Sequence, residues 1–102
     1  MEMRGLIEGC LVHYVLPEGP SKEEHRPAII LRVWNKVTGV VNLTVFYDWS
    51  NDAVEPGIPG NLTGTAWRTS VIYDPDKKLG TWHWIEREEE PGQAAHSGRW
   101  LI

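Results

Sequence analysis

Short hydrophobic runs with the two-residue period of a β-strand are the feature of this sequence that most restricts its fold. Stretches rich in Gly, Pro, Asn and Asp separate these runs, and no long segment has the apolar spacing of a helix. The runs predict strands at residues 9–16, 27–34, 40–47, 65–73 and 81–86. The sequence therefore predicts an all-β protein.

The number of strands and their connections predict the architecture. About five strands without a crossover helix are typical of a small antiparallel barrel or curled sheet of the SH3-like or OB-like size class. A chain of 102 residues fits one domain, which we place at residues 1–86. We expect residues 87–102 to form a C-terminal tail. The polar stretch 48–64 is long for a turn, so we expect a functional or mobile loop.

Alternation within two neighbouring runs assigns residues to the two faces of the sheet. We expect the core face to consist of Ile29, Leu31, Val33, Val41, Leu43 and Val45. The opposite face then carries Ile30, Arg32, Trp34, Asn42, Thr44 and Phe46. Because it combines aromatic, basic and amide groups, this second face is predicted to be a recognition surface.

Charge and residue usage argue against several classes of function. The formal net charge of −4 is opposite to the basic surface that duplex nucleic acid requires. No apolar stretch reaches the roughly 18 residues of a membrane span. The first ten residues lack a signal-peptide pattern, so we expect a cytoplasmic protein. Cys10 is the only cysteine, which excludes an intramolecular disulfide and a cysteine-based zinc cluster.

The segment "GTWHWIERE" contains two of the six tryptophans. In an extended strand Trp82 and Trp84 share one face, and His83 lies on the other. One interpretation is that the indoles close the barrel and His83 is half exposed. The other is that the indoles form a stacking wall for a planar ligand, with His83, Arg32 or Arg68 supplying hydrogen bonds. Both interpretations are open at this stage.

Histidines are the candidate metal ligands, and they are widely separated along the chain. They stand at His13, His25, His83 and His96. Since none lies at a short spacing from another, we predict no metal site and no cofactor, with a two-histidine site built from different strands as the alternative.

Catalytic signatures are lacking in the sequence, which has no glycine elbow around a serine and no phosphate-binding glycine loop. We predict a binding protein rather than an enzyme, with a small hydrolase based on Asp48 and Asp52 as the alternative. The predicted ligand-binding residues are His13, Arg32, Trp34, Asn42, Arg68, Trp82, His83 and Trp84.

Four segments, "VHYVL", "RPAIILRVW", "VNLTVF" and "GTWHWIERE", together resemble a widespread group of short, largely uncharacterised bacteriophage and prophage proteins. The resemblance covers roughly residues 9–86. In that group the closing motif usually reads GTWHWPE, and here Ile85 replaces the proline, so we expect the last strand to continue further. The resemblance implies a phage accessory protein, such as a virion component, a regulator of host machinery or an inhibitor of host defence.

These observations lead to two hypotheses about function. The first is a phage-encoded, homo-oligomeric binding protein in the cytoplasm of the infected cell, which captures a small planar ligand such as a nucleotide immune signal. The apolar end "RWLI" favours docking onto a second subunit. The alternative is a virion structural or adaptor protein whose aromatic residues form a protein–protein interface.

Overall fold

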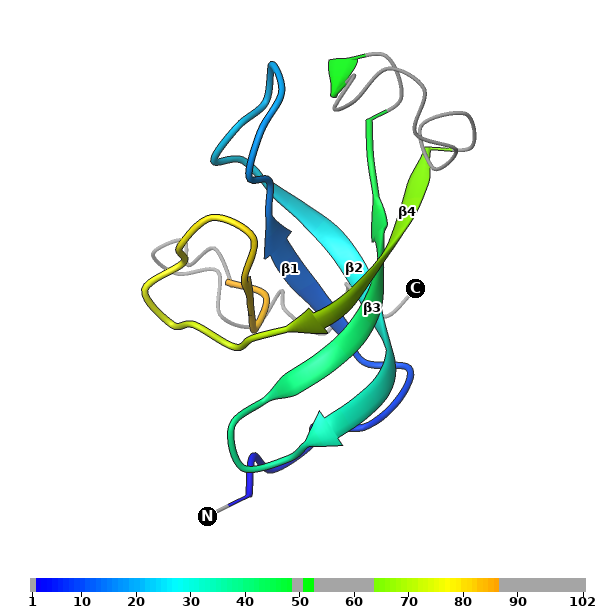
Figure 1. Ribbon diagram of the computed structural model, residues 1–102, viewed down its shortest axis with the longest axis vertical. Coiled ribbons are helices and arrows are strands. Elements are labelled where there is room, and N and C mark those ends of the chain that lie inside the picture. Colours follow the sequence, from blue (N-terminus) through cyan, green and yellow to red (C-terminus); the bar gives the residue numbers. More distant parts are fainter. Residues whose placement is uncertain (1, 49–50, 53–63, 87–102) are drawn as a thin grey trace, which may run out of the picture.

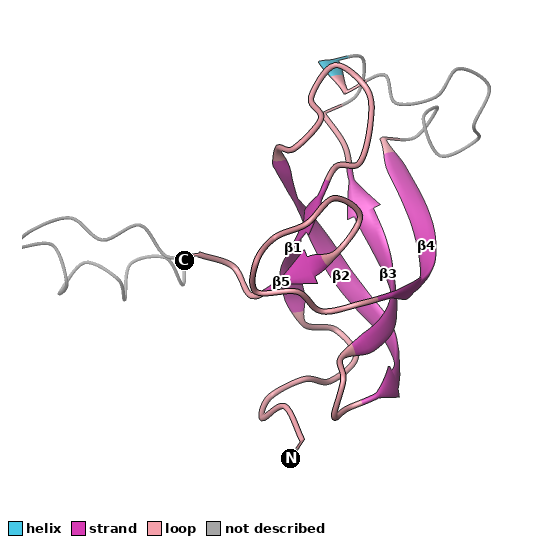
Figure 2. Cartoon of the chain, turned by 60° about the vertical axis from the view of Figure 1, so that its left-hand side comes forward, coloured by secondary structure: helices cyan, strands magenta, loops and turns pink. Residues whose placement is uncertain are grey.

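Five antiparallel strands form one curled sheet in the computed structural model, which describes residues 2–48, 51–52 and 64–86 (Figure 1). The strands are β1 (Leu11–Val15), β2 (His25–Asn35), β3 (Val40–Phe46), β4 (Thr65–Val71) and β5 (Trp82–His83). They lie in the order β4-β3-β2-β1-β5, and β5 is seen beside β1 in Figure 2. The predicted all-β class is therefore confirmed in its curled-sheet form.

The predicted strands overlap the observed ones, but β2 begins two residues before the predicted residue 27, and the last strand is much shorter than predicted. Tyr14 pairs with Trp82 and His13 with His83, and then β5 ends. The expected continuation through Ile85 is wrong, because the chain leaves the edge of β1 and Ile85 is exposed. No helix in the described part of the chain is long and apolar enough to cross a bilayer. The tail 87–102 and most of the loop 48–64 lie outside the described residues.

The concave side of the sheet holds the hydrophobic core, to which all five strands contribute. Its members are at most 5% exposed: Leu6, Val12, Tyr14, Leu16, Ala28, Ile30, Val41, Leu43, Val45, Val71 and Trp82. Burying a side chain of this size stabilises the fold by about 1.5–3 kcal/mol relative to leaving it in water. Burial of these side chains is therefore a main source of the stability of the curled sheet.

A β-bulge in β2 changes which of its residues face the core. Ile30 pairs with Leu43 and Arg32 pairs with Asn42, so two residues of β2 span one step of β3. Leu31 lies at this bulge and is 46% exposed. At this point the side chains of β2 no longer alternate regularly between the core side and the solvent side of the sheet.

The bulge explains where the predicted core is right and where it is wrong. On β3 the prediction is confirmed, since Val41, Leu43 and Val45 are fully buried. On β2 it is wrong for Leu31 and for Ile30, which was assigned to the opposite face and is only 1% exposed. Ile29 does not belong to the buried core either, whereas Val33, beyond the bulge, packs against it.

Trp82 anchors the sequence around β5 in the core. Its indole is fully buried, and its Nε1 donates a hydrogen bond of 2.7 Å to the carbonyl of Gly39. Gly39 has a φ of 82°, and a Cβ atom there would lie 2.6 Å from the Cβ of Tyr73. Only glycine fits this turn without a rearrangement. The tryptophan of β5 is thus hydrogen-bonded to the hairpin between β2 and β3, which is distant in sequence.

The side chain of Asn42 joins two irregular strands. Its Oδ1 accepts hydrogen bonds from Trp34 Nε1 at 2.8 Å, Thr69 Oγ1 at 2.8 Å and the backbone N–H of Ser70 at 3.0 Å. Ser70 has a φ of 54° and lies where the pairing of β4 with β3 shifts register. Asn42 therefore supplies an acceptor to a backbone group that the ladder leaves unpaired.

An ion pair connects the start of β2 to the segment after β3. Arg26 donates from Nε to Asp52 Oδ2 at 2.6 Å and from its Nη2 to Oδ1 at 2.7 Å. The Asp52 side chain is fully buried and also accepts from the backbone N–H of Asp48 at 2.6 Å. The hydrogen bonds from Arg26 hold the pKa of Asp52 well below its usual range. Asp52 is thus a structural carboxylate.

Replacing Asn42 should destabilise the sheet. We expect Asn42→Ala to lower the free energy of unfolding by about 2–4 kcal/mol, because three donors lose their acceptor. Chemical denaturation measures the loss. Asn51→Ala is the control, since Asn51 is exposed and its truncation should cost less than about 1 kcal/mol. Equal losses for the two variants would contradict the role of Asn42.

The Arg26–Asp52 pair should make stability depend on pH. Because the pKa of folded Asp52 lies below its ordinary value of 3.8, its contribution is present above that pH and is lost as the pH falls below it. We expect Asp52→Asn to cost about 3 kcal/mol at neutral pH and to reduce the loss of stability in acid. Denaturation at several pH values tests this, with the exposed Asp76→Asn as the charge-matched control. If Asp52→Asn is as stable at neutral pH as the unmodified chain, the Arg26–Asp52 pair does not contribute to the stability of the fold.

Candidate metal centre

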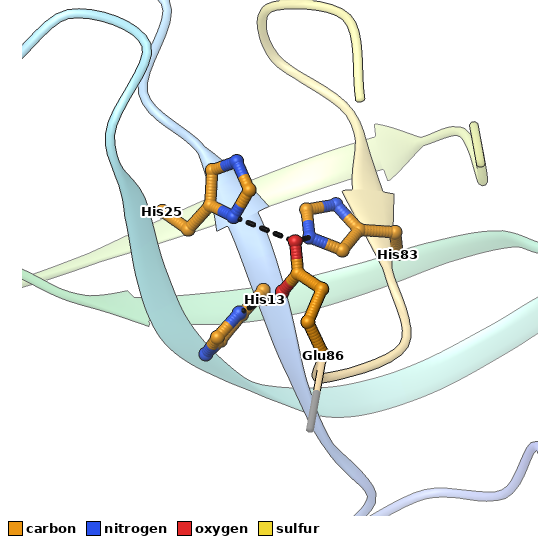
Figure 3. A group of neighbouring side chains, drawn as sticks. All are labelled: His13, His25, His83 and Glu86. Atoms are coloured by element: carbon orange, nitrogen blue, oxygen red, sulfur yellow. Dashed lines mark hydrogen bonds and ion pairs between the residues drawn. The ribbon is translucent and has the colours of Figure 1, made fainter. Parts of the chain in front are cut away.

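Three histidines from three strands meet on the convex face of the sheet (Figure 3). His13 of β1 pairs directly with His83 of β5, and on its other side with Pro27 of β2. His25 lies two residues before Pro27, on the same face. Because Trp82 points into the core, its neighbour His83 must point to the opposite side. The register of the sheet therefore gathers the three imidazoles.

Glu86 completes this group, and its carboxylate lies between the three rings (Figure 3). Its Oε1 is 2.7 Å from His13 Nδ1, and its Oε2 is 3.0 Å from His25 Nδ1 and 2.9 Å from His83 Nε2. Lys77 Nζ lies 2.9 Å from the same Oε2. We call His13, His25, His83 and Glu86 the three-histidine cluster.

The buried member of the cluster has unused hydrogen-bonding capacity. The His83 side chain is 3% exposed, and neither of its ring nitrogens has a hydrogen-bond partner within the described residues. The Glu86 oxygen at 2.9 Å lies close to Nε2, yet the contact lacks the direction of a hydrogen bond. An unsatisfied buried polar group costs about 1–3 kcal/mol. A ligand that binds Nε2 would remove part of this cost.

Ionisation of the cluster favours its metal-binding form. Burial lowers the pKa of His83 below its ordinary value, so its ring is neutral at neutral pH. For Glu86 burial acts to raise the pKa, but hydrogen bonds from Lys77, the backbone and His13 outweigh it and hold the pKa well below the usual range. Neutral imidazole and ionised carboxylate are the forms that coordinate metal ions.

The spacing of the cluster is close to that of a coordination shell. Its four ligand atoms lie within 4.8 Å of one another. A tetrahedral zinc ion with bonds of about 2.0–2.1 Å separates its ligand atoms by about 3.3 Å, so shifts of roughly 1–1.5 Å would form the shell. His13, His25 and Glu86 have side chains that are 25%, 28% and 35% exposed, which leaves room to rotate.

The structure separates the two tryptophans of the WHW segment. Trp82 is fully buried, so neither face of its indole is free for a ligand, whereas Trp84 is 37% exposed. The two rings meet edge to face at 5.2 Å. Of the two interpretations of this segment, burial of Trp82 matches the first. His83, expected to be half exposed, is instead buried within the three-histidine cluster.

The other predicted ligand-binding residues fall into separate places. Arg32, Trp34 and Asn42 are neighbours, with the Arg32 guanidinium 4.7 Å from the centre of the Trp34 ring. Arg68 pairs with the core residue Leu43, on the concave side, and its Nη2 donates to Tyr47 Oη at 3.0 Å. It is therefore not part of the Arg32 surface. That these residues bind a ligand stays a prediction.

Sequence reasoning named His25 as a candidate metal ligand but not as a ligand-binding residue, and it missed Lys77 and Glu86. The predicted second strand began at residue 27, so His25 was placed in a loop, although β2 begins with it. Glu86 was placed at the end of the predicted last strand, and its spacing from the histidines gave no sign of a shared site. The structure brings together three of the four candidate histidines, whereas His96 lies outside the described residues.

The alternative of a hydrolase based on Asp48 and Asp52 receives no support from their surroundings. Both Asp52 oxygens accept hydrogen bonds from Arg26, and the side chain is buried. The Asp48 carboxylate is exposed and accepts from Asn51 Nδ2 at 3.1 Å. Asp52 is therefore engaged in structural hydrogen bonds and does not form a catalytic pair with Asp48.

Comparisons with protein-family models, curated proteins and solved structures find no match to this chain.

Proposed function

We propose that this protein binds a divalent transition-metal ion, with zinc as the first candidate, through the three-histidine cluster. The observation that supports this is the convergence of three imidazoles and one carboxylate around a buried His83 that lacks a hydrogen-bond partner within the described residues. Histidine nitrogens and glutamate oxygens are among the atoms that bind zinc in proteins. The same set also suits copper, nickel and iron, so selectivity is a matter for experiment.

A bound ion would have a structural effect. It would join β1, β2 and β5 to Glu86, which follows β5, and β5 is only two residues long. Ligands that bind only the folded state stabilise it, by about 2.7 kcal/mol when their concentration is 100 times the Kd. We therefore propose that the ion stabilises the edge of the sheet formed by β5.

Capture of a planar ligand, such as a nucleotide, is a second proposal that rests on a different surface. What favours it is the Arg32 guanidinium over Trp34, together with Trp67, which is 58% exposed. Exposed aromatic and guanidinium groups are the usual partners of stacked bases. The phage origin, the homo-oligomer and the virion alternative stay predictions from the sequence.

A fluorescence titration tests this second proposal. We expect cyclic oligonucleotides to quench tryptophan emission, and we expect Trp34→Ala to weaken binding about tenfold, since stacking contributes about 1–3 kcal/mol per base. Exposed Val37→Ala, in the hairpin between β2 and β3, is the control for truncation elsewhere on the surface. No quenching by any nucleotide tested would rule the proposal out.

Metal titration tests the main proposal. By isothermal calorimetry we expect one zinc ion per chain, and we expect His83→Ala to weaken binding about a hundredfold, because each ligand supplies roughly a quarter of the binding free energy. Glu86→Gln should also weaken it. Glu24→Gln is the matched control, since Glu24 is 61% exposed and bonds Arg26 instead.

Circular dichroism of each variant without metal confirms that it is folded. If the unmodified protein does not bind zinc, the proposed centre is contradicted. The same conclusion follows if both His83→Ala and Glu86→Gln bind zinc with unchanged affinity.

A further inference from the structure

Lys77 is a cation held beside the candidate metal centre. Its Nζ is 2.9 Å from Glu86 Oε2, and its side chain is 43% exposed. The residue belongs to the turn between β4 and β5, which is far from β1 and β2 in the sequence. A metal centre requires anionic or neutral donors, so the lysine needs a separate explanation.

The backbone of this turn is fixed in an uncommon conformation at Lys77. Its φ is 63°, in the left-handed region that is unfavourable for a residue other than glycine. The Lys77 N–H donates to the Asp74 carbonyl at 3.0 Å, and the Asp74 N–H donates to the Trp82 carbonyl at 2.9 Å. The turn is therefore tied to β5, and it presents Lys77 to the cluster.

Charge at the site changes when an ion binds. Without metal, the ammonium of Lys77 and the carboxylate of Glu86 balance each other. With a divalent ion bound, the ion and the ammonium together exceed the single carboxylate of the cluster. A cation near an ion of the same sign is unfavourable unless an anion lies between them.

Solvent can reach the cluster from the side of its exposed ligands. The side chains of His13, His25 and Glu86 are between 25% and 35% exposed, so an incoming group has access to the ion. Zinc can expand its coordination from four to five ligands, and a carboxylate ligand can shift its binding mode. A further oxygen ligand is thus compatible with the site.

We propose that the metal-loaded centre binds an oxyanion, the phosphate or carboxylate group of a small molecule, which coordinates the ion and accepts a hydrogen bond from the ammonium of Lys77. This inference rests on the proposed metal binding. It names the chemical class of ligand for the centre and gives Lys77 the role of a ligand-binding residue. Lysine commonly binds phosphate as a point charge, and hydrogen bonds to charged groups are among the stronger ones.

Anion titration of the cobalt-loaded protein tests this inference. Cobalt(II) replaces zinc, and its visible absorption reports the coordination of the ion. Inorganic phosphate and acetate are added in separate arms, with chloride at equal ionic strength as the control. We expect a saturable change of the spectrum with phosphate, with acetate, or with both. The arm that responds identifies the preferred oxyanion.

Two lysine variants make the test specific. We expect half-saturation to require about tenfold more anion in Lys77→Met, because a charge-assisted hydrogen bond is lost. Lys78→Met is the matched control, since Lys78 is 76% exposed and its Nζ is 4.0 Å from Asp74 Oδ2, a partner outside the cluster. Lys78→Met should therefore bind the anion like the unmodified protein.

The affinity for cobalt itself separates a ligand-binding role of Lys77 from a structural one. We expect Lys77→Met to bind cobalt as well as the unmodified protein or more tightly, because the ammonium competes with the ion for Glu86. Loss of cobalt binding in Lys77→Met would assign the lysine to the folding of the site and overturn the inference.

The remaining outcomes are also decisive. If cobalt binds and neither phosphate nor acetate changes its spectrum, the oxyanion inference is wrong and metal binding stands. Equal half-saturation in the unmodified protein and Lys77→Met would likewise overturn it. If cobalt does not bind at all, the proposed function fails, and the inference fails with it.

Discussion

Burial of Trp82 is the constraint on which the arrangement of this protein depends. Its indole is fully buried and donates a hydrogen bond to the Gly39 carbonyl. In the sheet, Trp82 of β5 pairs with Tyr14 of the neighbouring β1. Since neighbouring residues of a strand point to opposite sides, this burial fixes His83 on the convex face, beside His13. The largest apolar side chain of the core thus also positions the buried imidazole of the candidate metal centre. The packing of Trp82 in the core and the position of His83 in the cluster both follow from the alternation of side chains along β5.

Local patterns predicted most of the fold, because hydrophobic alternation and turn residues act over short distances. The core face of β3 was predicted correctly, with Val41, Leu43 and Val45 buried. The prediction failed on β2 because a bulge adds a residue without any sign in the hydrophobic pattern, which moved Ile30 into the core. Asn42 helps to hold the irregular region together through bonds to β2 and β4, and such long-range bonds cannot be read from spacing.

The candidate site could be predicted only in part for a related reason. Alternation in the WHW segment places Trp82 and His83 on opposite faces, but it does not say which face is buried. The convergence of His13, His25 and His83 depends on the strand order, which places β1 between β2 and β5. Glu86 joins them only because β5 ends after two residues and the chain turns toward the cluster. The order of the strands and the early end of β5 are set by tertiary structure. The spacing of the histidines along the sequence therefore does not show that they meet in one site.

X-ray absorption at the zinc edge of the loaded protein would show whether the three-histidine cluster binds the ion, because it identifies the atoms bound to zinc. We expect imidazole nitrogens at about 2.0–2.1 Å, with the outer-shell scattering of histidine rings, and one carboxylate oxygen at about 2.0–2.2 Å. A spectrum of water oxygens alone, without histidine scattering, would contradict the three-histidine centre. So would sulfur at about 2.3 Å, since Cys10 is the only cysteine and is not part of the cluster.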